Sequence, residues 1–293
     1  MGQQSVQPSD NGKFEPGLFT DDGLQRDVPP TILVAEDNVV NQRIIILLLE
    51  KLGLQAYVVN NGIEAVKAVS EHDYPVVLMD CHMPEMDGFE ATRAIRKMEA
   101  ISGKHTPIIA VTALAMAGDR ERCIDAGMDD YIPKPIDKER LKNKLNQWMK
   151  HEFAFHNQKL AEKFFEANAK TATFQTDPID LAELEVFYGS QEEVEEVLRL
   201  FVSTTERQLP DLEMAITEKR GNLAARMAHE LKGASASVGA KEMSLLCLQL
   251  EQEVGQQDWQ ASSDTLVKIC HCFDRINQFV NRTFSKPASR TAQ

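Results

Sequence analysis

The sequence predicts an α/β doubly wound domain with a five-stranded parallel sheet, followed by an all-α four-helix bundle. Short apolar runs alternate with amphipathic stretches from residue 30 to about residue 150, which is the pattern of repeated βα units. The apolar runs are nearly continuous, as expected for strands that helices cover on both faces of a parallel sheet. After about residue 177 the strand pattern stops, whereas helical patterns continue to about residue 283. The 293 residues are enough for two such domains.

Each element expected in the first domain, residues 30–150, follows from a local pattern. The five expected strands are the apolar runs TILVA, LQAYVV, VVLMD, IIAVT and MDDYI. The amphipathic stretches predict helices at about 38–52, 62–71, 87–100, 115–126 and 137–150. Ligands of a doubly wound domain bind at the carboxyl ends of its strands, so we expect the functional residues at that edge of the sheet.

The second domain, residues 177–283, carries helix signals instead. Asp-Pro at 177–178 is typical of a helix start, and Ser-Gln-Glu-Glu at 190–193 fits a capping box. The long helix that follows should bend near Pro210 and end near Gly221. Further helices are expected at about 222–237, 240–255 and 258–283. The remaining segments are expected to be a disordered tail or linker, a partly helical linker and a disordered tail, at 1–29, 151–176 and 284–293.

The composition argues against several classes of protein. A net charge of −13 disfavours nucleic acid or an anionic membrane as the main partner, because both require neutralisation by Lys and Arg. The longest apolar run near the start, Ile44 to Leu49, has six residues, and we recognise no leader. We therefore expect no membrane insertion and a cytoplasmic location. An odd number of cysteines predicts free thiols; they are Cys81, Cys123, Cys247, Cys270 and Cys272.

Five side chains of complementary chemistry lie at or near the expected strand ends. Glu36 and Asp37 follow the first strand, and Asp80 ends the third. Thr112 ends the fourth strand, and Lys134 comes shortly after the fifth. Because these strand ends meet at one edge of a parallel sheet, we expect the five side chains to converge. The threonine can donate a hydrogen bond to a phosphoryl oxygen, and the lysine can neutralise another.

The expected carboxylate cluster can bind magnesium, which prefers oxygen ligands. We predict Asp37 and Asp80 as direct ligands, with the backbone carbonyl of His82 as the third. Glu36 is expected to act through a water molecule, and the side chain of His82 is expected to be an exposed bystander. The cation would screen an incoming phosphate from Asp80, whose carboxylate can attack phosphorus in line.

Together these residues resemble the receiver domain of two-component response regulators. The resemblance covers residues 30–150 and rests on Glu36-Asp37, Asp80 with MPEMDG behind it, Thr112-Ala113 and Lys134-Pro135, in the family's order. It implies that Asp80 is the phosphoacceptor and that Tyr131 changes position with Thr112 on phosphorylation. It also implies a cis Lys134–Pro135 bond. A phosphatase of the haloacid-dehalogenase type would need a second aspartate where this chain has His82.

The second candidate site is the motif AHELKGASASVGA around His229. On a helix the apolar side chains around Leu231 form a narrow core stripe, and His229 lies about 160° away from its centre. We therefore expect an exposed His229, with Lys232 one turn on to offset phosphoryl charge and the small Gly233 leaving room for a partner. A neutral imidazole is a competent nucleophile toward phosphorus.

This motif resembles that of the histidine phosphotransfer (HPt) domain, a His followed by Leu-Lys-Gly and a later Gly. The matching residues are His229, Leu231, Lys232, Gly233 and Gly239. The resemblance spans about 177–283. It implies that His229 is the phosphorylated histidine and that a response-regulator receiver domain docks around it.

The two resemblances predict an intermediate of a two-component phosphorelay. A sensor histidine kinase would phosphorylate Asp80 in the presence of Mg²⁺, and His229 would exchange the phosphoryl group with a receiver aspartate. The sequence lacks an Asp-x-Gly-x-Gly motif, so we expect no kinase activity. Two alternatives remain: the chain is the carboxyl-terminal part of a membrane-bound hybrid sensor kinase, or it is a phosphorylation-controlled binding switch without relay.

Overall fold

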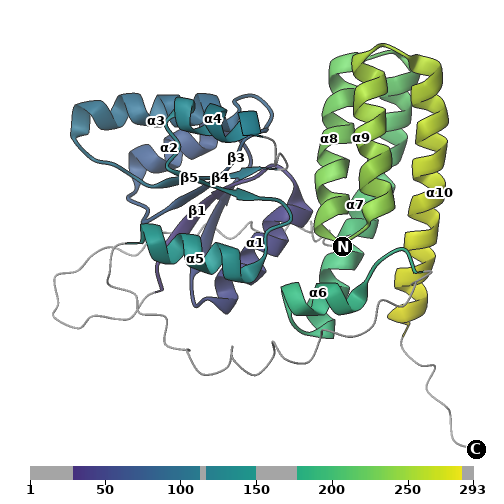
Figure 1. Cartoon of the computed structure of the whole chain (residues 1–293), viewed down its shortest axis with the longest axis horizontal. Helices are drawn as coiled ribbons and strands as arrows, with labels where there is room; N and C mark the ends of the chain where they lie inside the picture. Colours follow the sequence, from purple (N-terminus) through teal and green to yellow (C-terminus); the bar gives the residue numbers. More distant parts are fainter. Residues whose placement is uncertain (1–28, 113–116, 150–176, 286–293) are drawn as a thin grey trace, which may run out of the picture.

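The computed structural model describes residues 29–112, 117–149 and 177–285, which form an α/β domain and a helical bundle (Figure 1). The expected fold class is confirmed for both parts. The linker expected at 151–176 and most of the two expected tails lie outside the described residues. Phe284, expected to begin the carboxyl-terminal tail, is instead buried, and its carbonyl accepts a hydrogen bond from Arg199 Nη2 at 3.0 Å.

The sheet contains five parallel strands in the order β2-β1-β3-β4-β5. The strands are β1 (Thr31–Ala35), β2 (Gln55–Val59), β3 (Val77–Asp80), β4 (Ile108–Thr112) and β5 (Asp130–Pro133). The five expected strands are thereby confirmed. Their order places β1 and β3 side by side in the middle of the sheet, so the chain segments that follow these two strands are neighbours.

Helices cover both faces of the sheet. They are α1 (Val39–Lys51), α2 (Gly62–Glu71), α3 (Gly88–Ser102), α4 (Ala117–Ala126) and α5 (Lys138–Trp148). Ile32 and Val34 share a buried layer with α1 and α5, whereas Leu33 and Ala35 share one with α2, α3 and α4. Successive strand residues point to opposite faces, so one continuous apolar run serves both layers.

Two helix caps fix the loops that leave β1 and β3. Asn38 begins α1, because its Oδ1 accepts hydrogen bonds from the backbone nitrogens of Val40 and Asn41 at 3.0 and 3.2 Å. Asp87 begins α3 through a capping box with Glu90. The acidic residues after β1 and β3 therefore lie on short loops whose helix-side ends are capped.

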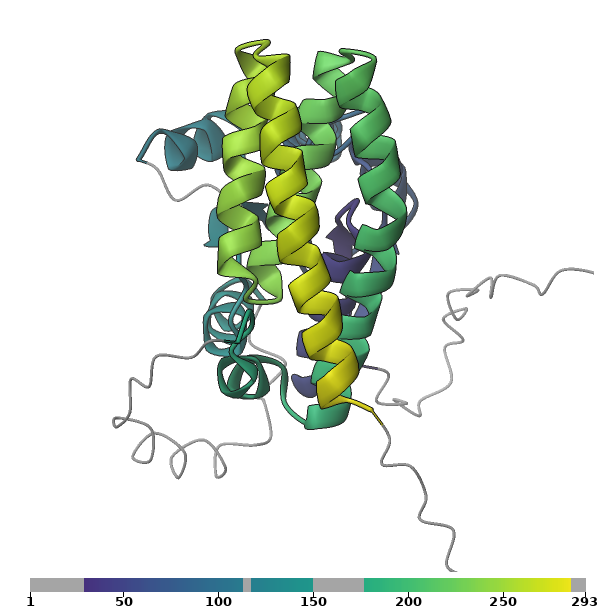
Figure 2. The same ribbon diagram turned by 90° about the vertical axis from the view of Figure 1, so that its right-hand side faces the viewer.

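The second part is a bundle in which four long helices lie side by side (Figures 1 and 2). Its helices are α6 (Leu181–Tyr188), α7 (Gln191–Thr217), α8 (Gly221–Ser237), α9 (Lys241–Gly255) and α10 (Trp259–Thr283). The expected capping box of Ser190 and Glu193 is confirmed at the start of α7.

Two expected helix boundaries are wrong. The helix start expected at 177–178 lies at Leu181, because Asp180 is the residue whose side chain accepts from a backbone nitrogen of the first turn. Helix α7 ends at Thr217 rather than near Gly221. It ends there because Lys219 adopts a φ of 56°, in the left-handed region, and the next backbone nitrogen turns back to the α7 carbonyl of Ala215.

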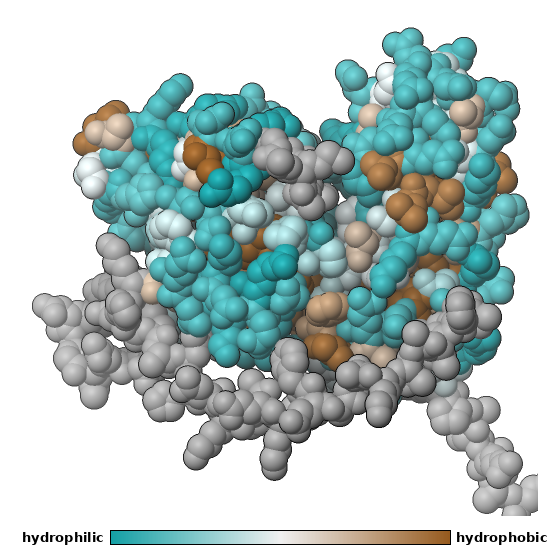
Figure 3. All heavy atoms as spheres, in the orientation of Figure 1, coloured by the Kyte–Doolittle hydropathy of each residue, from teal (hydrophilic) through white to brown (hydrophobic). Residues whose placement is uncertain are grey.

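Helix α1 lies between the sheet and the bundle and contacts α6, α7 and α8 (Figure 1). One apolar core extends from the sheet face that α1 covers into the interior of the bundle. Away from this core, hydrophilic side chains dominate the visible face of both parts (Figure 3). The two domains are thus packed against each other through α1, the helix that follows β1.

Candidate functional site: two facing polar clusters

Asp80, the last residue of β3, lies at the carboxyl edge of the sheet and is 7% exposed. Its Oδ2 accepts a hydrogen bond from Lys134 Nζ at 2.6 Å, and its Oδ1 accepts one from the backbone nitrogen of His82 at 3.1 Å. Burial lowers the pKa of Lys134, but Asp80 and Glu36 more than offset this effect and raise it above its usual range. The ammonium is therefore charged at neutral pH and can pair with a further anionic group bound beside Asp80.

Three carboxylates converge at this edge, as expected. Glu36, Asp37 and Asp80 each place a side-chain oxygen within 4.8 Å of the others. Burial raises the pKa of Asp37 to about 7, and repulsion from Asp80 adds to the rise. A nearby cation would stabilise the ionised form of these carboxylates, and all three offer the oxygen ligands that magnesium prefers. The donor set therefore fits a magnesium site.

Glu36 is held more firmly than the other two acids and is 1% exposed. Its Oε2 accepts from Lys134 Nζ at 2.7 Å, and its Oε1 accepts from Asn41 Nδ2 at 2.9 Å. Burial raises its pKa to about 8, although the Lys134 ammonium opposes the rise. Both oxygens of Glu36 are thus engaged by side chains of the protein.

The loop after β3 depends on glycine. A Cβ on Gly88 would lie 2.0 Å from the carbonyl oxygen of Asp80, so a side chain there requires the backbone to move. The Gly88 nitrogen also donates to the carbonyl of Cys81 at 3.2 Å. This close approach brings the start of α3 directly against Asp80.

The remaining predicted residues of the α/β domain lie on β4 and β5. Thr112 is buried at the end of β4, beside the strand that carries Asp80, and its carbonyl accepts from the Lys134 nitrogen at 2.7 Å. The expected cis Lys134–Pro135 bond is confirmed. Tyr131 on β5 is 36% exposed, so it is not a core aromatic. Ala113 lies outside the described residues.

The bundle centre is a cluster of three side chains on α8 and α9. His229 Nδ1 lies 3.0 Å from Glu251 Oε1, and Lys232 Nζ donates to Glu251 Oε2 at 2.6 Å. Glu251 Oε1 can only accept a hydrogen bond from Nδ1, and the Lys232 ammonium, which lies 3.2 Å from the same nitrogen, can only donate. Burial raises the pKa of Glu251, but hydrogen bonds from His229 and Lys232 outweigh this effect and hold it at about 2. Sequence reasoning missed Glu251, because a single acid on a helix carries no signal of its own.

The two centres face each other. The ring centroid of His82 lies 5.0 Å from that of His229 and 6.1 Å from that of Phe89. The expectation of an exposed, uninvolved His82 side chain is therefore wrong, because the packed bundle half-buries it. Burial and the nearby His229 lower the pKa of His82. The expectation of an exposed His229 is also wrong: its side chain is 23% exposed, because it packs against the ring of His82 and contacts Glu251. His229 does lie outside the apolar core of the bundle, as expected.

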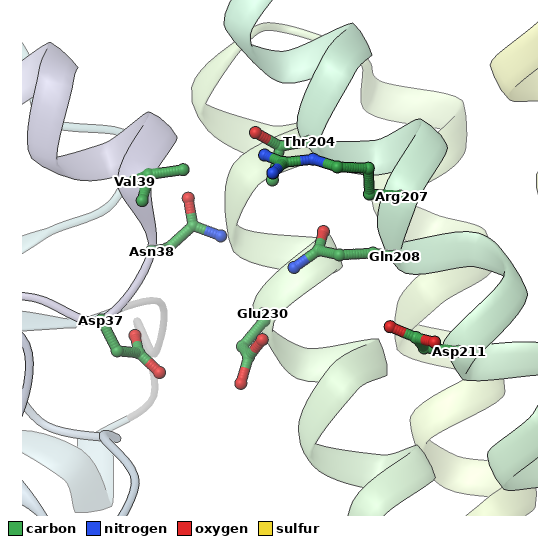
Figure 4. A pocket seen from close by; sticks show the side chains of 8 residues that line it. All are labelled: Asp37, Asn38, Val39, Thr204, Arg207, Gln208, Asp211 and Glu230. Carbon is green, nitrogen blue, oxygen red and sulfur yellow. The ribbon is translucent and has the colours of Figure 1, made fainter. Parts of the chain in front are cut away.

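A pocket of about 420 Å³ lies beside the carboxylates, between α1 and the bundle (Figure 4). Its lining residues are Asp37, Asn38, Val39, Thr204, Arg207, Gln208, Asp211 and Glu230. The carboxylates of Asp37 and Glu230 face each other across it (Figure 4). Burial raises the pKa of Glu230, and Glu230 adds to the rise at Asp37. The bundle thus contributes negative charge to the surroundings of the acidic cluster.

Two family models match the chain. Residues 32–146 match the response regulator receiver domain, and residues 196–279 match the Hpt domain. The chain therefore combines a receiver domain with an Hpt domain, which are the modules of a two-component phosphorelay. Among the residues described, no helix has the length and apolar character needed to span a membrane.

Relatives include histidine kinases. Hybrid signal transduction histidine kinase I of Dictyostelium discoideum is 44% identical over 124 residues, which are 41% of this chain and 7% of the kinase. Sensor histidine kinase GacS of Pseudomonas protegens is 27% identical over 248 residues, which are 84% of this chain and 26% of GacS. The chain thus spans about a quarter or less of the length of these two relatives. The receiver domain of sensor histidine kinase PA1611 from Pseudomonas aeruginosa PAO1, solved with a magnesium ion in the active site cleft, is 44% identical. That match covers 42% of this chain and 98% of the solved chain, with a TM-score of 0.39.

Proposed function

We propose that this chain is a phosphorelay intermediate in which a phosphoryl group moves between Asp80 and His229. One observation carries the proposal: the His229 ring lies against the ring of His82, two residues beyond Asp80. A sensor histidine kinase would supply the phosphoryl group to Asp80. The receiver aspartate of a separate response regulator would exchange it with His229.

Asp37 and Asp80 would hold a magnesium ion, with the carbonyl of His82 as a further ligand and Glu36 acting through water. Bound magnesium would neutralise charge on the phosphoryl oxygens and on the clustered carboxylates. The close approach of three carboxylate oxygens supports this ligand set.

The other side chains of the receiver would bind the phosphoryl group. Lys134, which hydrogen-bonds to Asp80, would donate a charge-assisted hydrogen bond to a phosphoryl oxygen and neutralise part of its charge. Thr112 would donate its hydroxyl to another oxygen, and Tyr131 would change position with it. The exposure of Tyr131 on β5 supports this movement, because the ring can turn without breaking the core.

With the proton on Nδ1, which the Glu251 carboxylate favours, transfer would need no proton to leave the histidine ring. The Nε2 lone pair of His229 would attack phosphorus while the phosphorus–oxygen bond to Asp80 breaks and that carboxylate departs. The ring then carries a positive charge, which the Glu251 carboxylate at 3.0 Å offsets. Lys232 would offset the charge of the phosphoryl oxygens, and Gly233 would let the receiver approach closely.

We further infer that the chain signals by phosphotransfer and does not act as a kinase. Its partners would be a sensor kinase upstream and a response-regulator receiver that docks on the bundle, without nucleic acid and without membrane insertion. The expected location is the cytoplasm, or the cytoplasmic side of the inner membrane if the chain belongs to a hybrid kinase.

The test uses a small labelled acyl-phosphate donor with magnesium and maps the residue that holds the label. The wild-type chain should carry label on Asp80 and on His229. The Asp80→Asn variant should lose both labels, and His229→Gln should keep only the aspartyl label. Label on His229 in the Asp80→Asn variant would contradict transfer through Asp80.

A further inference from the structure

The receiver helix α1 has two buried faces, although an isolated surface helix needs only one. One apolar cluster joins α1 both to the sheet and to the bundle, and in it Val40, Ile44 and Leu47 are 0%, 2% and 3% exposed. These three residues recur at helical spacing on the side of α1 from which Arg43 and Lys51 reach the bundle. The run that made α1 unusually apolar thus provides a docking stripe for the bundle.

Two ion pairs flank this stripe and join α1 to the first turns of α7. Arg43 Nε and Nη2 donate to the two carboxylate oxygens of Glu196 at 2.7 and 2.8 Å, which is a bidentate pair. Lys51 Nζ lies 2.8 Å from Glu193. Both cations belong to the receiver and both anions to the bundle, so the charges of the two surfaces are complementary.

Two features of the bundle, a glycine and a capped glutamate, form the binding site for the Lys51 ammonium. Gly189 has a φ of 105°, and a Cβ there would lie 2.2 Å from Lys51 Nζ. Glu193 is held by the backbone nitrogen of Ser190 at 2.7 Å, because it is also the capping-box residue of α7. The anion that receives the lysine is therefore held in place by its own helix cap, and Gly189, whose positive φ favours glycine, leaves space beside it.

A third, buried contact ties the docking surface to the phosphorylation site. Ser237 on α8 donates to Asn41 Oδ1 at 2.9 Å, and Asn41 Nδ2 donates to Glu36. A Cβ on Gly233 would lie 3.8 Å from Asn41 Nδ2, so the glycine of the histidine motif lies against the same asparagine. The docked bundle is thereby connected through Asn41 to Glu36 of the acidic cluster.

We propose that Arg43 and Lys51 on α1, with Glu196 and Glu193 on α7, select the chain's own receiver as the docking partner of its bundle. This inference rests on the proposed function and names the partner. The docked receiver covers the face of the bundle that carries His229, so a second receiver must displace it. A competing receiver binds well when it places cations opposite Glu193 and Glu196.

The first experiment measures transfer from Asp80 to His229 within the full chain in a single turnover. Arg43→Glu should slow this transfer by about tenfold, because it sets two carboxylates against each other. Arg43→Glu combined with Glu196→Arg should restore most of the rate. The control is Arg275→Glu, which breaks an exposed ion pair with Glu242 inside the bundle and should leave the rate unchanged. Equal rates in the wild type and in Arg43→Glu would overturn the proposal.

The second experiment separates selection from simple loss of contact. The donor chain is His229→Gln phosphorylated on Asp80, and the acceptor chain is Asp80→Asn. Adding Arg43→Glu to the acceptor frees its Glu196 for the donor's Arg43, so transfer between chains should rise several-fold. A fall in this transfer, or no change, would overturn the covering of the His229 face by the chain's own receiver.

Small-angle X-ray scattering tests docking without any transfer. The radius of gyration of Arg43→Glu with Lys51→Glu should exceed that of the wild type, and the Arg275→Glu control should match the wild type. If the wild type never labels His229 yet the charge variants expand, the proposed function fails and the docking surface stands. If transfer occurs and the charge variants neither slow nor expand, the docking surface fails and the relay stands.

Discussion

Glu251 should set how the phosphoryl group is shared between Asp80 and His229. Its carboxylate contacts His229 Nδ1 at 3.0 Å and Lys232 at 2.6 Å, and it opposes the positive charge of a phosphorylated ring. Glu251→Gln keeps the shape and one acceptor oxygen but removes the charge. A hydrogen bond to a charged group contributes about 1 kcal/mol more than a neutral one, which shifts an equilibrium about fivefold. The variant should therefore hold about fivefold less phosphoryl group on His229 relative to Asp80.

The assay lets a phosphorylated chain equilibrate and then compares acid-labile phosphohistidine with base-labile acyl phosphate. Glu242→Gln, on the same helix and paired with Arg275, is the control and should leave the ratio unchanged. A wild-type ratio in Glu251→Gln would refute the role of this carboxylate as a counter-charge. A larger share of the phosphoryl group on His229 in Glu251→Gln would contradict a stabilising effect of the Glu251 charge on the phosphorylated ring.

Three further predictions concern stability and local geometry. The pKa of Glu251 is lowered to about 2 from 4.5, so its contribution to stability is complete above about pH 4.5 and is lost toward pH 2. The Tm of the wild type should therefore depend more steeply on pH in this window than the Tm of Glu251→Gln. The raised pKa of Asp37 means that its ionisation destabilises the fold without a cation, so Asp37→Asn should raise Tm by about 3 °C in chelator at pH 8. The same variant should abolish the stabilisation by magnesium that we expect of the wild type. An unchanged Tm in chelator would argue against crowding of the acids. Gly88→Ala should nearly abolish acyl-phosphate labelling of Asp80 and lower Tm, whereas Gly255→Ala, which meets no neighbour, should label normally; normal labelling of both would contradict the close approach of α3.

The strand ends were predictable because apolar runs and parallel topology are encoded locally. The runs ending at Ala35, Asp80 and Thr112 specify both the strands and the edge at which their polar residues meet. The helical period likewise placed His229 on the side of α8 away from the bundle core. Each of these inferences needs only residues that are near in sequence or related by a regular repeat.

Residues whose roles depend on docking could not be predicted in the same way. His82 was expected to be exposed because nothing in its own loop covers it; α8 of the other domain does. Glu251 belongs to a different helix from His229, and no local sequence pattern indicates which faces of α8 and α9 meet. The apolar run Ile44–Leu49 did carry a signal, since it exceeds what one buried helix face requires. Read with Arg43 and Lys51 beside it, that excess indicates a second packing surface.

The most direct test of the account is the time course of label in the wild-type chain after brief exposure to an acyl-phosphate donor with magnesium. Label should appear first on Asp80 and then on His229, at a rate that does not depend on chain concentration, because the two centres face each other within one molecule. Label that stays on Asp80 while His229 remains unmodified would contradict the relay, and transfer that slows in proportion to dilution would contradict docking within the chain.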